Sequence, residues 1–162
     1  MGAYQLERTR EIQAPAGKIW DQLLDVKSWP EWKPFIPATS GREVIRALGD
    51  RFQMKIRVKG PFAFPVPVRV CEFDPPRRVA WTGGIPGTVI SVHSFILEDR
   101  GASTRVTSRE EFTGALVGLM LQMVTPQDLE KLHEQWLEAI QRRMESPGHF
   151  GKKAGLGKSF GN

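Results

Sequence analysis

Residues 52–58 alternate strictly between apolar and polar side chains, reading Phe, Gln, Met, Lys, Ile, Arg and Val. Successive side chains of a β-strand point to opposite faces of a sheet, so this run predicts a strand with one buried face and one wet face. The pattern returns at Val66, Val68 and Val70, after the proline-containing loop KGPFAFP. Two consecutive amphipathic strands indicate an antiparallel sheet in the middle of the chain.

Turn residues divide the rest of the chain into further strands. Asp74-Pro75-Pro76 and Gly83-Gly84 are turn signals, and Glu-Asp-Arg-Gly at 98–101 is the clearest hairpin signal. We predict seven antiparallel strands: 4–13, 42–47, 52–58, the run through Val66, Val68 and Val70, a run from Val79 to Gly83-Gly84, 89–97 and 104–112.

Two helical regions frame the predicted sheet. The first begins at Ala14-Pro15, where proline suits the first turn, and ends before the prolines of WPEWKPFIP at 29–37. The second covers residues 126–145, with a break or kink expected near Thr125 and a separate helical turn within 114–124. Its apolar stripe consists of Leu129, Leu132, Trp136, Leu137, Ile140 and Met144.

Length and composition limit the classes of protein to consider. The chain has 162 residues, of which 40% are hydrophobic, which is sufficient for one domain with one core. No apolar run is long enough to span a membrane, and MGAYQLER lacks the apolar centre of a signal peptide. Cys71 is the only cysteine, so no internal disulfide can form. We therefore expect a cytoplasmic protein.

The formal charge of +5 is concentrated at the carboxy end. Residues 1–145 carry 20 Lys and Arg against 18 acidic residues, whereas residues 146–162 add three lysines and no acid. This glycine-rich tail is expected to be flexible. Because the remainder is near charge balance, we expect no specific binding of nucleic acid.

Known motifs for metals and nucleophiles are absent from the sequence. His93, His133 and His149 lack the spacing of metal ligands, and no Gly-x-Ser-x-Gly elbow occurs. Cys71 falls on the outward parity of its strand. We therefore predict no metal, no cofactor and no side-chain nucleophile.

Strand parity assigns the side chains that face inward. If Met54 faces inward, hairpin pairing carries the same face through Glu72, His93 and Glu110. A turn near Arg100 would place His93 opposite Ser108 and Ser91 opposite Glu110. Diagonal neighbours lie about 7 Å apart, within reach of a hydrogen bond between His93 and Glu110. This pair is either an acid and base or a mutually satisfied structural pair.

Four segments carry a family resemblance: IQAPAGKIWDQLLDVKSWPEWKPFI, EFDPPRRVAW, HSFILED and TRVTSREEFTG. In their order the chain resembles the START-like (SRPBCC) superfamily of polyketide cyclase/dehydrase-like and lipid-transfer proteins. The resemblance covers residues 4–145 and divides the chain into a domain of residues 1–145 and a tail of residues 146–162. It implies an α+β helix-grip fold, in which a curved seven-stranded antiparallel sheet wraps a long C-terminal helix and two short helices follow the first strand.

The resemblance also implies an apolar cavity between the sheet and the C-terminal helix. Trp29 is then expected in the core, while Trp32 belongs either to the core or to the cavity rim. The expected ligand-binding residues are Trp32, Phe35, Phe52, Met54, Ile56, Phe62, Val68, Val70, Trp81, His93, Phe95, Glu110, Met120 and Met123.

Three functions remain open at this point. The first is a carrier or sensor of a hydrophobic small molecule of lipid, polyketide or aromatic type. The second is an enzyme similar to the polyketide cyclases, with His93 and Glu110 as candidate catalytic residues for proton transfer. The third is a chaperone-partner interaction module. The sequence leaves the oligomeric state open between a monomer and a homodimer.

Overall fold

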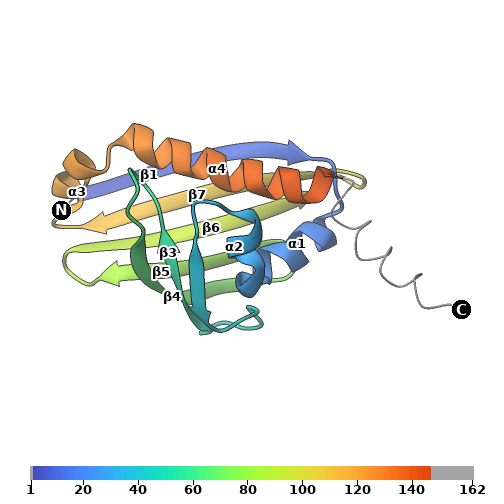
Figure 1. The fold of residues 1–162 in the computed structure, drawn as a ribbon, viewed down its shortest axis with the longest axis horizontal. Coiled ribbons are helices and arrows are strands. Elements are labelled where there is room, and N and C mark those ends of the chain that lie inside the picture. The colour runs from blue at the N-terminus through green and yellow to red at the C-terminus, as the bar shows by residue number, and fades with distance from the viewer. Residues whose placement is uncertain (1, 147–162) are drawn as a thin grey trace, which may run out of the picture.

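The structure is a computed structural model that describes residues 2–146. Seven strands form one antiparallel sheet in the order β1-β7-β6-β5-β4-β3-β2 (Figure 1). The strands are β1 (Gly2–Ile12), β2 (Ala38–Gly41), β3 (Arg51–Ile56), β4 (Phe64–Asp74), β5 (Arg78–Ile85), β6 (Val89–Asp99) and β7 (Thr104–Gly114). The predicted helix-grip fold is confirmed, whereas the expected tail lies outside the described residues, apart from Ser146.

The helices are α1 (Ala16–Leu24), a 3-10 turn η1 (Val26–Ser28), α2 (Trp29–Trp32), α3 (Val117–Met123) and α4 (Pro126–Glu145). Helices α1, α3 and α4 lie in the predicted helical regions, and the second short helix that the resemblance implies begins the WPEWKPFIP stretch. Figure 1 shows α4 running along the sheet, with α3 near one of its ends and α1 and α2 towards the other. In the described part of the chain, no helix has the length and apolar character needed to cross a membrane.

The predicted break near Thr125 is confirmed and has a clear cause. The Thr125 side chain accepts a hydrogen bond from the backbone N–H of Asp128, and the Asp128 carboxylate accepts one from the backbone N–H of Thr125. This reciprocal capping box, with Pro126 in the first turn, fixes the start of α4. Trp136 of α4 is fully buried and packs on Trp81 and Phe95 of the sheet.

The predicted strand at 42–47 is wrong. Backbone N–H groups of Arg46 and Ala47 donate to the Asp50 carboxylate at 2.7 and 3.1 Å, so a side chain replaces the strand partner there. The residues form a loop that buries Ile45, and the pairing strand β2 lies earlier, with Gly41 opposite Phe52.

The predicted inward position of Glu72 is also wrong. Pairing between β4 and β5 shifts between Val70 and Glu72, which places an extra residue, Cys71, in β4. Such a bulge exchanges the two faces of the strand beyond it. Glu72 consequently points outward to Arg78, and Phe73 packs against Trp20 instead.

Candidate functional site

A cavity of about 190 Å³ lies between the inner face of the sheet, α3 and α4. Met54 and Ile56 are buried and face this cavity, so the inward face predicted for their strand is correct. The lining is apolar except for Ser91, His93 and Glu110. The complete set is Met54, Ile56, Val58, Val66, Val68, Trp81, Ser91, His93, Glu110, Phe112, Met120, Val124, Leu129, Leu132 and Trp136.

Seven of the residues expected from the sequence line this cavity: Met54, Ile56, Val68, Trp81, His93, Glu110 and Met120. Val58, Val66, Ser91 and Phe112 were on the inward parity of the strands, and Leu129, Leu132 and Trp136 were on the apolar stripe of the terminal helix. Strand parity and the apolar stripe of the helix therefore pointed to seven cavity residues that were not among the expected ligand-binding residues. No pattern in the sequence pointed to Val124.

The other seven expected residues lie elsewhere. Phe35, Phe52, Val70 and Phe95 are packed inside the hydrophobic core. Phe62 and Met123 are 73% and 69% exposed. Trp32 is half-buried, donates its indole N–H to Ser28 and lines an outer groove beside Glu138 and Arg143. Trp29 is in the core, as expected.

Two of the three polar side chains of the cavity, His93 and Glu110, belong to a hydrogen-bonded chain. Nε2 of His93 lies 2.8 Å from Oγ of Ser108, and the same oxygen lies 2.8 Å from Nδ1 of His133. Nε2 of His133 lies 2.9 Å from a carboxylate oxygen of Glu110. The chain joins β6, β7 and α4.

The predicted pairing of His93 with Glu110 needs correction. The β6–β7 register places His93 directly opposite Glu110 and Ser91 opposite Phe112, two residues from the register predicted for this hairpin. The two side chains nevertheless bond to other partners, His93 to Ser108 and Glu110 to His133. Sequence reasoning missed His133, although it falls between Leu129 and Trp136 on the buried side of the terminal helix.

Burial decides the protonation of His93. Its imidazole is 5% exposed and lies against the rings of Trp81, Phe95 and Trp136. Loss of hydration holds the pKa of His93 well below 6.5, and the nearby His133 and Lys33 lower it further. His93 is therefore neutral at physiological pH.

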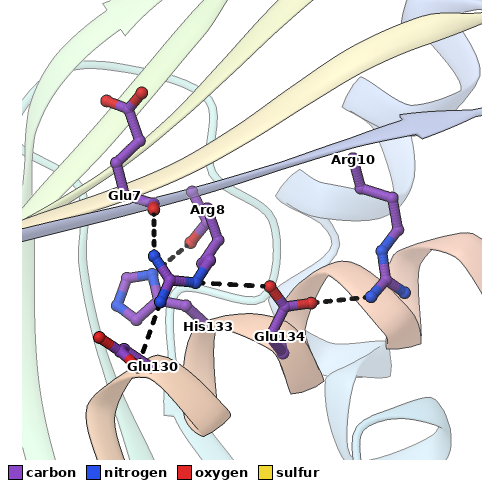
Figure 2. A network of polar contacts seen from close by, with 7 residues as sticks. Glu7, Arg8, Arg10, Glu130, His133 and Glu134 are labelled. Atoms are coloured by element: carbon purple, nitrogen blue, oxygen red, sulfur yellow. Dashed lines mark hydrogen bonds and ion pairs between the residues drawn. The ribbon is translucent and has the colours of Figure 1, made fainter. Parts of the chain in front are cut away.

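Ion pairs between β1 and α4 flank His133 on the helix. Arg8 lies 3.2 Å from Glu130 and 3.6 Å from Glu134, and Arg10 lies 2.8 Å from Glu134. Figure 2 shows these contacts beside His133, which comes from the same part of α4. The pairs link α4 to β1 on either side of His133, the residue that completes the chain from Ser108 to Glu110.

A second unusual group lies outside the cavity. Lys33, directly after α2, is fully buried, and its Nζ lies 3.9, 4.3 and 4.0 Å from the ring centres of Trp29, Trp32 and Trp136. Among the described residues no atom accepts a hydrogen bond from this amine. Burial lowers the pKa of Lys33 well below 10.5.

Within residues 2–146 no cluster of His, Cys, Asp or Glu is arranged to hold a metal ion.

Comparison with known proteins agrees with this architecture. Residues 4–145 match the family described as polyketide cyclase / dehydrase and lipid transport. The oxopyrrolidines biosynthesis cluster protein O of Penicillium oxalicum is 31% identical over 90 residues, which represent 43% of this chain and 45% of that protein. The chain thus spans about half the length of this curated relative.

Two solved structures illustrate the shared fold. The Zhui aromatase/cyclase from a Streptomyces species has a TM-score of 0.68 and 17% identity, covering 91% of this chain and 99% of that one. A START superfamily protein from Mycobacterium smegmatis has a TM-score of 0.70 and 16% identity, with 89% and 98% covered.

Proposed function

Because the chain belongs to the polyketide cyclase/dehydrase and lipid transport family, we propose that it binds a hydrophobic small molecule in the cavity, as a carrier or sensor. The observation that supports this is the apolar cavity between sheet and helix, with its few polar groups gathered on one wall. Such a lining takes up apolar area and orients one polar group of the ligand.

The size of the cavity narrows the ligand class. An apolar cavity of about 150 Å³ holds benzene, and pockets for drug-sized ligands begin at about 300 Å³. The cavity of about 190 Å³ therefore favours a compact ligand of one or two rings over an extended lipid chain. A carbonyl on such a ligand can accept a hydrogen bond from the Ser91 hydroxyl, and a ligand hydroxyl can also donate to His93 or Glu110.

The test uses β-tetralone, a bicyclic ketone with one polar group. We expect it to bind and to change the tryptophan fluorescence, since Trp81 and Trp136 both line the cavity. Met120→Ala should weaken binding by up to about tenfold, because it removes wall contacts worth roughly 1 kcal/mol.

Met123→Ala is the matched control for that variant. Met123 lies on the same helix three residues away, is 69% exposed and does not line the cavity. Equal effects of the two substitutions, or fluorescence that never saturates, would contradict binding in the cavity.

An enzyme similar to the polyketide cyclases is the second candidate. The observation that favours it is that His93 and Glu110, a base and an acid, lie opposite each other on the cavity wall. Catalysis would use the same ligand site, so binding comes first in either case.

A further inference from the structure

We propose that Glu110, His133, Ser108 and His93 form a proton relay between two points of the cavity wall, and that its ligand is a carbonyl compound with an acidic neighbouring C–H. This inference rests on the proposed function for the presence of a ligand. It adds a reaction class, proton abstraction and return beside a carbonyl, and assigns roles to Ser108 and His133.

The geometry of the relay is continuous from end to end. Three contacts of 2.8, 2.8 and 2.9 Å link the four side chains, all within hydrogen-bonding distance. Only the two ends, His93 and Glu110, line the cavity. Ser108 and His133 are fully buried, so protons can pass between the ends without meeting solvent.

When both imidazoles are neutral, the chemistry of the groups fixes the direction of each hydrogen bond. A Glu110 carboxylate only accepts, so a neutral His133 carries its proton on Nε2 and accepts on Nδ1. The Ser108 hydroxyl must then donate to Nδ1 of His133, and its oxygen accepts from Nε2–H of His93. Nδ1 of His93 is left as a base, and no other group among residues 2–146 bonds to it.

The relay step then balances in protons and electrons. A ligand C–H gives its proton to Nδ1 of His93, and the electron pair stays on the ligand as an enolate. The Nε2 proton of His93 moves to Ser108, the Ser108 proton moves to Nδ1 of His133, and the Nε2 proton of His133 moves to Glu110. The same shifts in reverse return a proton to the ligand and restore the first set of tautomers.

Four largely buried polar side chains cost more hydration than apolar residues in the same positions would. Burying two imidazoles with centres 4.7 Å apart costs hydration that apolar residues would not lose. A device that moves protons needs all four groups, because removing either middle member interrupts the path.

The first test needs no ligand and reads the histidine tautomers by NMR of the full chain labelled with ¹⁵N-histidine. On acid titration we expect His93 to stay neutral while its proton changes from Nε2 to Nδ1, at the same midpoint as the change at His133. The titratable groups that face His93 are His133 on α4, Glu110 on β7 and Lys33 after α2.

Ser108→Ala is the decisive variant, since Ser108 does not line the cavity. It should abolish the tautomer change of His93 at the His133 midpoint, and Ser108→Thr, which keeps the hydroxyl, should retain it. A tautomer change that persists in Ser108→Ala, or separate midpoints in the unsubstituted protein, overturns the relay.

The second test measures exchange of the acidic C–H protons of β-tetralone in D₂O. We expect catalysed exchange that falls by about tenfold or more in Ser108→Ala, with unchanged affinity, since acid–base catalysis contributes about 10²–10⁴. Binding with equal exchange in both proteins overturns the relay but leaves the proposed binding intact. Failure of β-tetralone to bind overturns the carbonyl ligand, while the histidine tautomers still decide the relay.

Discussion

At the scale of single residues, Lys33 is the most costly group in the core. Hydrating an ammonium ion is worth several kcal/mol, whereas the indole faces around Nζ return about 2 kcal/mol. Burial therefore outweighs the aromatic rings, in agreement with the lowered pKa of Lys33. We expect Lys33→Met, which keeps the length of the side chain, to stabilise the protein by about 1 to 4 kcal/mol.

The pH dependence separates the charge of Lys33 from its packing. Because the folded pKa of Lys33 is below the unfolded value, the unfolded chain binds more protons, and the free energy of unfolding rises with pH up to about 10.4. Urea unfolding at several pH values between 7 and 10 should show this rise in the unsubstituted protein and less of it in Lys33→Met. An equal slope in both would contradict a lowered pKa.

At acidic pH, the free energy of unfolding depends on the lowered pKa of His93. Its pKa is also lowered, so stability is present above about pH 6.5 and falls as the pH falls through that value towards the folded pKa. His93→Gln should lose less stability between pH 7 and 5. At pH 7 the substitution should lower the free energy of unfolding by about 1 kcal/mol, because the amide makes only an imperfect hydrogen bond to Ser108.

At the scale of elements, the capping box sets where α3 ends and α4 begins. Thr125→Ala removes the acceptor for the Asp128 N–H and should destabilise the protein by about 1 kcal/mol, whereas Thr125→Ser should be nearly neutral. Chemical unfolding measures both variants. A Thr125→Ala protein as stable as Thr125→Ser would show that the proline alone starts the helix.

The elements were predictable from sequence wherever the chain has a simple period. Alternation located β3, and helical spacing with a capping sequence located α4 to the residue. The loop around Ile45 was missed because a carboxylate, Asp50, substitutes for a strand partner. The bulge at Cys71 was missed because an inserted residue leaves no local mark on composition.

The candidate site was predictable only in part, because its polar contacts cross between elements. Parity gave His93 and Glu110, and the observed register sets them directly opposite each other, yet they bond to Ser108 and His133 instead. His133 reaches Ser108 from a helix about twenty-five positions away, which no spacing rule encodes. Lys33 was not singled out at all, because a lysine between prolines resembles an exposed loop residue.

At the scale of the whole molecule, charge argues against nucleic-acid binding. Residues 1–145 carry a balance of two positive charges, and the last 17 residues contribute three lysines. Contacts to three phosphates give a salt slope of only about −3, so any retention on DNA at low salt should vanish at physiological salt. Tight binding by a chain ending at residue 145 would contradict this.

The shape of the whole domain also limits ligand length. The cavity of about 190 Å³ is bounded by α3 and α4, with Met120 and Val124 on the α3 side. An extended chain such as palmitate therefore needs displacement of α3, and its binding must offset the loss of the contacts that bury Val117. We expect β-tetralone at one hundred times its Kd to stabilise the protein by about 2.7 kcal/mol, as mass action requires. Palmitate at the same concentration should give a much smaller rise in Tm. A larger rise with palmitate would show that α3 opens readily and would favour a lipid as the ligand.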